Sequence, residues 1–267
     1  MVPGAGRLVS LIVFLMLFSP VAAKAALPGD TNNDGIVSIS EVRSAINAYL
    51  GLIKLPSPVG VWRSTNGAEF IYLVLFSDKS FLYAENDLEA VTAAENGLEV
   101  GTYTNDAANM NFNITYDDNA PGHDSGVGDI GTPSVIDYSF STDGNTLTVA
   151  GGQVVLNRVT FNSSSMVGVW RSVNGAEFSY LILFADNTFL YAENDLQAVS
   201  PEENGVEVGT YTVVNNRVTF NVIYDDNAPG QDSGVGDVGI PAVYDMTLSA
   251  DGATLSVAGE LTWTRAF

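Results

Sequence analysis

The sequence predicts a mostly β protein: two tandem eight-stranded antiparallel barrel-like domains, preceded by a short loop-helix unit. Three observations lead to this prediction. A long segment occurs twice in near-identical form, apolar residues within each copy recur with a period of two, and a polar twelve-residue loop followed by a helical apolar pattern precedes the first copy. Each copy has about 100 residues, which makes it a whole domain rather than a short solenoid repeat.

The first 25 residues have the pattern of a secretory signal peptide. Arg7 gives a positive start, residues 8–18 form an apolar run, and small residues surround Ala23 and Ala25. The run is shorter than the about 20 residues that cross a bilayer, which argues against the alternative, a membrane anchor. We expect an exported protein (extracellular, cell-surface or periplasmic) with no membrane span after signal cleavage.

Residues 30–41, DTNNDGIVSISE, match the EF-hand calcium-loop pattern at every constrained position. Ca²⁺ prefers six to eight oxygen ligands, and Gly35 stands at the sixth position, where the loop turns sharply. The alternative is an acidic, Asn-rich surface turn. The predicted ligands are the side chains of Asp30, Asn32 and Asp34, the carbonyl of Ile36, Ser38 through a water, and both oxygens of Glu41.

A helix is predicted directly after this loop. Its apolar residues fall at helical spacing on one stripe: Val42, Ala45, Ile46, Tyr49 and Leu50. Loop and helix together resemble half of a dockerin, the calcium-dependent docking module of secreted polysaccharide-degrading assemblies. Dockerins carry two such units, usually with Asp where Glu41 stands and small hydroxyl residues where Ile39-Ser40 stand. The resemblance therefore implies calcium binding, whereas partner docking does not carry over.

The duplication sets the domain boundaries. VGVWRSTNGAEFIYLVLF at Val59 recurs as VGVWRSVNGAEFSYLILF at Val167, and YDDNAPGHDSGVGDIG recurs as YDDNAPGQDSGVGDVG. The linkers on either side of the first copy are short, so we expect the copies to lie close together. The predicted divisions are 1–25 signal peptide, 26–52 calcium unit, 53–58 linker, 59–161 first repeat, 162–166 linker and 167–267 second repeat.

Each repeat is predicted to form eight antiparallel strands. In the first they cover 59–64, 69–76, 80–86, 98–104, 109–116, 135–141, 146–150 and 154–161. Asn-Gly and Asp-Gly pairs between them suit tight hairpins. An up-and-down barrel would remove exposed sheet edges, and a two-sheet sandwich is the main alternative. The strand at 69–76 is apolar on both faces, so its outer face needs cover from the sister repeat or a partner.

Each repeat opens with Gly-x-Trp and closes with an arginine: Trp62 with Arg158, and Trp170 with Arg265. This arrangement resembles the lipocalin-type (calycin) barrels, in which a first-strand tryptophan packs against a last-strand arginine at the closed end. Arg over an indole face is a favourable cation–π contact. The alternative is that both tryptophans are ordinary core aromatics. The resemblance implies a barrel that is filled by its own side chains or holds one small ligand.

Charge and composition restrict the function. The net charge is −21, and cleavage of the signal peptide would remove two positive charges, Arg7 and Lys24. The mature protein should therefore repel nucleic acid and attract divalent cations. The absence of cysteine excludes disulfides and a lipoprotein anchor. The acidic loops 117–129 and 225–237 could hold a second kind of calcium site, but solvated turns are favoured.

Catalysis has no positive support in the sequence. The carboxylate pairs Glu85/Asp87 and Glu95/Glu99 are interpreted as solvated surface, and the only histidine, His123, is replaced by glutamine in the second copy. We expect a non-enzymatic exported calcium-binding protein whose barrels bind a small apolar ligand, a glycan or a protein partner. The alternatives are an accessory or catalytic subunit of a polysaccharide-degrading assembly, and a structural or adhesion surface protein.

Overall fold

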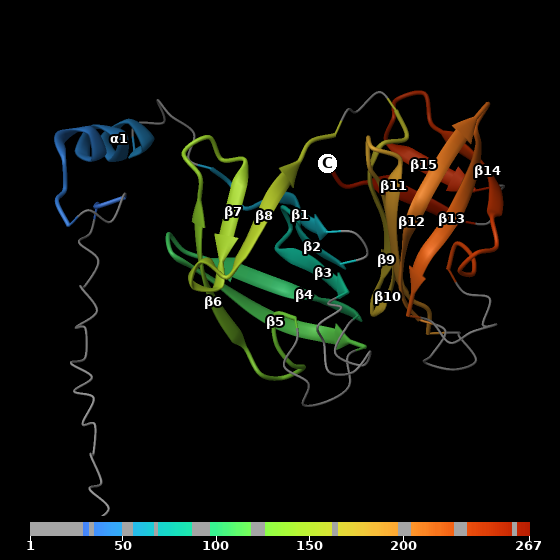
Figure 1. Cartoon of the computed structure of the whole chain (residues 1–267), viewed down its shortest axis with the longest axis horizontal. Coiled ribbons are helices and arrows are strands. Elements are labelled where there is room, and N and C mark those ends of the chain that lie inside the picture. The colour runs from blue at the N-terminus through green and yellow to red at the C-terminus, as the bar shows by residue number, and fades with distance from the viewer. Residues whose placement is uncertain are drawn as a thin grey trace, which may run out of the picture. The chain divides into compact units, whose positions relative to one another are not determined.

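The computed structural model describes residues 29–31, 35–49, 56–66, 69–86, 97–118, 126–161, 165–196, 204–226, 234–257 and 261–267. The predicted signal peptide lies outside these residues. The chain divides into two units, Met1–Leu55 and Pro56–Phe267. The helix α1 (Ile39–Tyr49) belongs to the first unit, and both barrels belong to the second (Figure 1).

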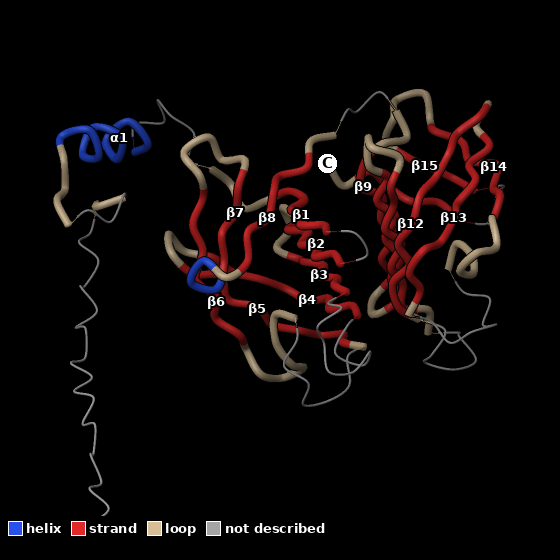
Figure 2. Tube along the Cα trace, viewed as in Figure 1, coloured by secondary structure: helices blue, strands red, loops and turns tan. Residues whose placement is uncertain are grey.

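Each repeat forms a closed eight-stranded antiparallel barrel, as the sequence predicts (Figure 2). The first consists of β1 (Gly60–Asn66), β2 (Glu69–Leu75), β3 (Ser80–Asn86), β4 (Gly97–Asn105), β5 (Asn109–Asp117), β6 (Ser134–Phe140), β7 (Thr146–Val149) and β8 (Val154–Val159), with a 3-10 turn η2 (Ala150–Gly152) before β8. The second consists of β9 (Gly168–Asn174), β10 (Glu177–Leu183), β11 (Thr188–Asn194), β12 (Gly205–Val214), β13 (Arg217–Asp225), β14 (Ala242–Leu248), β15 (Thr254–Val257) and β16 (Leu261–Arg265).

The hairpins form where the turn residues predict them. Lys79, with φ 71°, closes the β2–β3 turn, and its N–H donates to the Phe76 carbonyl at 3.1 Å. Gly144, with φ 71°, closes the β6–β7 turn, where its N–H donates to Ser141. Positive φ costs glycine nothing, so the Asp-Gly pair fixes this turn and the strand register that follows from it.

The first and last strands of each repeat pair and close the barrel. In the first barrel Trp62 on β1 stands opposite Arg158 on β8. The Arg158 guanidinium carbon lies 4.1 Å from the centroid of the Trp62 ring, and Arg265 lies at the same distance over Trp170. Arg158 also donates hydrogen bonds to the carbonyls of Ser57, Val59 and Gly144. The Arg158 guanidinium thus covers this end of the barrel and donates to carbonyls of residues that lie outside the strands.

The barrel interiors are packed with large side chains around the tryptophans. In the first barrel Phe81 packs edge-on against Phe112 at 4.9 Å, and Phe189 and Phe220 repeat this contact in the second. The first interior cluster also contains Trp62, Leu73, Leu75, Tyr83, Tyr103, Met110, Ile114, Val127, Leu147 and Leu156. Side chains therefore fill this part of the barrel.

A separate apolar core forms between the two barrels. It draws mainly on the outward-facing residues of the second strand of each repeat, β2 and β10, and on the residue that follows it: Phe70, Tyr72, Val74 and Phe76 in one, and Phe178, Tyr180, Ile182 and Phe184 in the other. The contacts are reciprocal, because Tyr72 stacks on Phe184 and Phe76 stacks on Tyr180, at 5.4 and 5.5 Å. The sister repeat thus covers the second apolar face of β2, which was one of the two covers that the sequence predicted.

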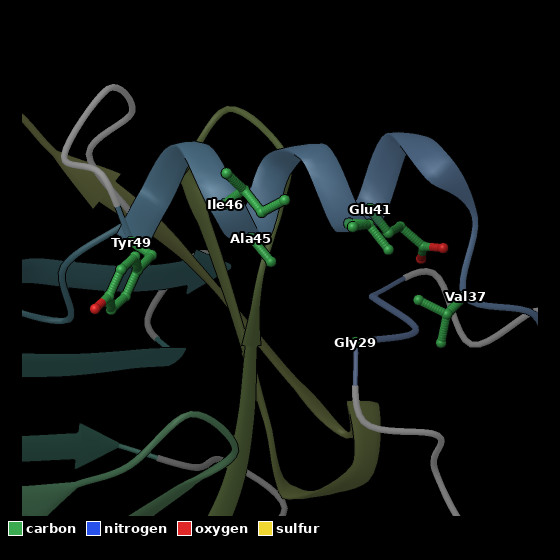
Figure 3. Close-up of a pocket in the computed structure, with 7 residues that line it drawn as sticks. Gly29, Val37, Glu41, Ala45, Ile46 and Tyr49 are labelled. Carbon is green, nitrogen blue, oxygen red and sulfur yellow. The ribbon is translucent and has the colours of Figure 1, made fainter.

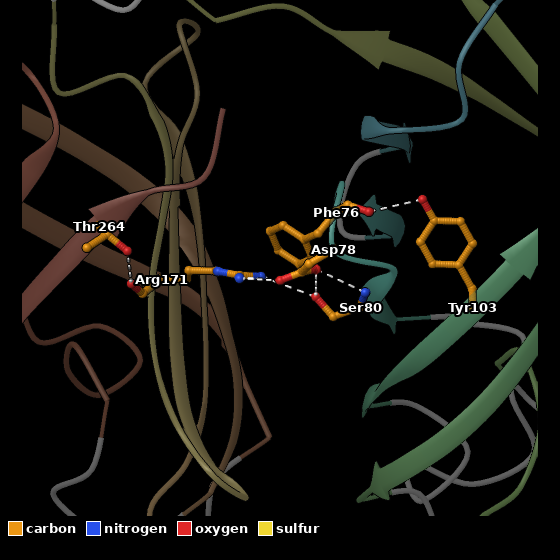
Figure 4. Close-up of polar contacts among 6 residues, drawn as sticks. All are labelled: Phe76, Asp78, Ser80, Tyr103, Arg171 and Thr264. Carbon is orange, nitrogen blue, oxygen red and sulfur yellow. Dashed lines mark hydrogen bonds and ion pairs between the residues drawn. The ribbon is translucent and has the colours of Figure 1, made fainter.

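Two equivalent ion pairs flank this core. Arg171 pairs with Asp78, donates to Ser80 Oγ at 3.2 Å and lies over the Phe76 ring (Figure 4). In the mirrored contact, Arg63 pairs with Asp186 and lies over Phe184. Like surfaces meeting with exchanged roles are the mark of an isologous interface, here within one chain.

Candidate functional site

The described part of the predicted calcium loop is closed by its own hydrogen bonds. The Gly35 N–H donates to Asp30 Oδ2 at 2.7 Å, and Gly35 has φ 85°, a left-handed conformation that suits glycine. Asp30, Ile36, Ser38 and Glu41 are described, whereas the predicted ligands Asn32 and Asp34 lie outside the described residues. Asp30 at the first position is therefore tied across the loop to the sixth.

Glu41 turns back from α1 into the loop. Its Oε2 accepts hydrogen bonds from the N–H and the hydroxyl of Ser38, both at 2.8 Å, and its Oε1 accepts from the N–H of Thr31 at 2.7 Å. The Glu41 N–H donates to Ser38 Oγ at 3.3 Å, which completes a reciprocal capping box at the start of α1. Donation from the Ser38 backbone, ahead of the other bonds, lowers the pKa of Glu41 to about 2. The carboxylate is therefore charged at neutral pH and held at the loop.

The residues present fit a calcium ion in chemistry. All four described candidates offer hard oxygen atoms, and Asp30 and Glu41 bring the first and last positions of the loop into one hydrogen-bonded segment. Among the described residues no three His, Cys, Asp or Glu side chains gather as a metal cluster. The predicted set needs Asn32 and Asp34 in addition, so this finding does not bear on it.

The predicted apolar stripe of the helix is exposed within its unit. Val42, Ile46 and Tyr49 line a shallow pocket together with Val37 and Glu41, and Tyr49 is 91 % exposed. Figure 3 shows Glu41 near one end of α1 and Tyr49 near the other. Leu50 lies outside the described residues. An 11-residue helix with little burial is marginal in water, so the cap at Ser38 and Glu41 is its main described support.

The end of each barrel away from the Trp–Arg pair, called the mouth below, holds buried carboxyl groups that were predicted to be solvated. Glu85 was expected on a solvated surface, but it is only 6 % exposed, and Glu99 is only 1 % exposed. The Tyr83 hydroxyl donates to Glu85 Oε2 at 2.6 Å, and Tyr191 makes the same bond to Glu193. The antiparallel pairing of β3 with β4 places Tyr83 opposite Glu99, so both side chains lie on one face of the sheet.

A Gly-Val-Gly loop closes over these carboxyls. The Val127 N–H donates to both oxygens of Glu99, at 3.1 and 3.0 Å, and the Val127 side chain enters the interior cluster. A Cβ on Gly126 would lie 1.7 Å from Glu99 Oε1, and Gly126 has φ 89°. In the second barrel the Val235 N–H donates to Oε2 of Glu207 at 2.9 Å. The repeated GVG segment therefore acts as a plug over the carboxyl group. It can lie this close to the carboxyl only because its first glycine has no Cβ.

Burial changes the ionisation of the plugged carboxyls. Desolvation, the largest cause, together with the nearby charges of Asp117 and Asp225, raises the pKa of Glu99 to about 8 and that of Glu207 to about 9. Both groups are therefore largely protonated at neutral pH. In the sequence, Tyr-x-Glu followed by Glu-Val-Gly in both copies was the only available sign of this site.

The two acidic loops are partly used for structure. Asp117 stands opposite Glu99 in the β4–β5 register, and Asp118 accepts a hydrogen bond from the Leu98 N–H. The Val206 N–H donates to Asp226 in the second barrel. Asn119, Asp124, Asn227 and Asp232 lie outside the described residues, so the second calcium site, the less favoured alternative from the sequence, is untested.

No protein-family model matches this chain, and no curated protein has a similar sequence. Within the described part of the chain, no helix has the length and apolar character needed to cross a membrane. The lipocalin and dockerin resemblances therefore rest on the residues alone.

Proposed function

We propose that this protein is an exported, non-enzymatic calcium-binding protein with lipocalin-like binding barrels. The observation that carries the calcium assignment is the loop closure: Asp30 accepts from Gly35, and Glu41 accepts from Ser38 and Thr31. In the proposed site the ligands are Asp30, Asn32, Asp34, the Ile36 carbonyl, Ser38 and Glu41. A Ca²⁺ ion would replace the repulsion between these carboxylates with a shared attraction and order the unit.

Calorimetric titration of the full chain with Ca²⁺ tests this assignment. We expect one site in the loop, and we expect Glu41→Gln to remove tight binding, because an amide supplies only one neutral oxygen. Asp245→Asn is the matched control, since it removes one exposed carboxylate on β14 and should leave binding unchanged. Unchanged affinity in Glu41→Gln would refute the assignment.

The barrels are proposed to act as binding modules at their mouths. Side chains fill the tryptophan end, whereas pockets open at the mouth, where Glu85 and Asn86 line one and Glu193 and Asn194 line the other. This lining favours a polar ligand over the apolar ligand expected from the sequence. The glycan and protein partners considered from the sequence stay alternatives, to be tested by binding to insoluble glycan and to a cohesin-type protein.

A further inference from the structure

The surfaces through which the two barrels meet are made of corresponding residues. Each buried residue that the first repeat supplies to this core has its counterpart from the second repeat in the same core. The aromatic members are identical, since Phe70, Tyr72 and Phe76 correspond to Phe178, Tyr180 and Phe184. Among the buried members only Val74 and Ile182, and Leu98 and Val206, differ in type, each by a single methylene group.

The aromatic contacts across this core come in matched pairs. The rings of Phe70 and Tyr224 meet edge-on with centroids 5.3 Å apart, and the rings of Phe178 and Tyr116 meet in the same way at the same distance. The two stacked ring pairs described above have interplanar angles of 25° and 26°. Each barrel therefore presents to its sister the same surface that it receives, so this surface is complementary to a copy of itself.

The polar contacts beside the core are matched as well. Arg63 donates to the Thr188 hydroxyl at 3.3 Å, and Arg171 donates to the Ser80 hydroxyl at 3.2 Å. Each arginine also pairs with the aspartate two residues before that hydroxyl (Figure 4). If two first repeats met through this surface, Arg63 of one would face Asp78 of the other with the same charge complementarity.

A short connection keeps the pairing within one chain. Phe161, which follows β8, packs on Phe184 with ring centroids 6.3 Å apart, and the Ser165 carbonyl accepts a hydrogen bond from Arg265 at 2.6 Å. Only residues 162–164 separate these two anchored positions in the sequence. A short tether gives an effective concentration on the order of 1 mM, so pairing within the chain predominates at micromolar concentration.

We propose that this surface also joins repeats of different chains, and that its partner is a second copy of this protein. When the repeats of one chain separate, each pairs with the corresponding repeat of the second copy and recovers the contacts that it left. Two such pairs close a dimer, and pairs that do not close extend the assembly. The inference goes beyond the proposed function, because it depends on the barrel surfaces and not on calcium or ligand binding.

Exchanging the charges of one repeat tests this pairing in the full chain. In the variant Arg63→Asp/Asp78→Arg, both ion pairs between the first and second repeats become like-charge contacts. Two first repeats of this variant still place opposite charges face to face, and two second repeats keep the native charges. We expect light scattering over a concentration series to show dimerisation at least about tenfold stronger than in the native chain. The difference should shrink at about 1 M salt, which screens these half-exposed charges.

The matched control exchanges the charges of both repeats. Adding Arg171→Asp and Asp186→Arg restores opposite charges between the first and second repeats, so this variant should be as monomeric as the native chain. Thermal unfolding shows whether each variant is folded. The proposal is overturned if the folded two-substitution variant dimerises no more strongly than the native chain, or if the four-substitution variant associates as strongly as the two-substitution variant.

Deleting residues 162–164 is a second test that leaves the surface itself unchanged. The deletion makes Phe161 and Ser165 neighbours, with Cα atoms about 3.8 Å apart, so one chain cannot keep both in their present places. We expect the deletion variant to have at least twice the monomer mass in light scattering, because its repeats pair between chains. A folded deletion variant that stays monomeric would contradict the proposal.

Discussion

Arg158 lies over the indole ring of Trp62, with its guanidinium carbon 4.1 Å from the ring centroid, and this contact links β8 to β1 in the first barrel. The same cation donates to three backbone carbonyls around the closed end. It therefore acts through both its charge and its fork of donors, which neither lysine nor an apolar residue reproduces.

Replacing this arginine should destabilise the barrel. We expect Arg158→Met to lower the free energy of unfolding by about 2 to 4 kcal/mol, because a cation–π contact and three hydrogen bonds from a charged donor are lost. Urea denaturation measures the change. Arg217→Met, which removes an exposed arginine from β13, is the control and should cost less than about 0.5 kcal/mol. Equal effects of the two substitutions would show that Arg158 does not close the barrel.

The core between the barrels should matter more than the ion pairs that flank it. Phe184 is 1 % exposed and packs on Tyr72, so we expect Phe184→Ala to cost about 3 to 5 kcal/mol. Arg63→Ala removes a half-exposed ion pair and a cation–π contact and should cost about 1 to 2 kcal/mol. Thermal and urea unfolding compare them. A larger loss in Arg63→Ala than in Phe184→Ala would contradict the interface described.

The close contact of the GVG plug with Glu99 can be tested by adding a single methyl group to the plug. We expect Gly126→Ala to destabilise the protein by more than Gly131→Ala, because both have positive φ but only a Cβ at Gly126 meets the Glu99 carboxylate. Each change carries the strain of about 1 kcal/mol for alanine in this conformation, and the difference between them isolates the contact. Equal losses of stability would show that the plug does not press on Glu99.

The plugged carboxyls also make stability depend on pH. The pKa of Glu99 is raised from 4.5 to about 8 and that of Glu207 to about 9, so the folded protein holds these protons where the unfolded chain releases them. The stabilisation that these two protonated carboxyls give the folded state is fully present below pH 4.5 and is lost as the pH rises through 8 to 9. The free energy of unfolding falls by up to about 1.4 kcal/mol per group and pH unit.

Melting temperatures measured from pH 5 to pH 9 should therefore fall, and Glu99→Gln should flatten the decline because the amide cannot ionise. Glu41 acts in the opposite direction, since its pKa is lowered to about 2, and its contribution is lost as the pH falls through that value. A melting temperature that rises between pH 6 and pH 9 would rule out the buried state of Glu99 and Glu207.

Most of the fold follows from local patterns in the sequence. The period-two runs and turn pairs place the strands to within a residue or two of their ends, because Gly144 and similar residues fix each hairpin locally. The apolar second face of β2 also predicts a covered surface, and Tyr72 and Phe76 indeed pack on the sister barrel.

The barrel mouth could not be predicted in this way. Glu85 ends a strand next to a turn, where a charged residue is normally solvated. The β3–β4 register places its neighbour Tyr83 opposite Glu99, and the GVG plug that covers Glu99 comes from a segment 28 residues further along the chain. Such contacts leave no local periodic signal, and only the recurrence of the same residues in both copies marked them.

Native mass spectrometry of the chain purified in calcium, compared with its Glu41→Gln variant, tests the central claim most directly. The account predicts one tightly held Ca²⁺ on the native chain and none on Glu41→Gln, with both proteins equally folded. A native chain without calcium, or a variant that retains its ion, would contradict the assignment of residues 30–41 as the calcium site.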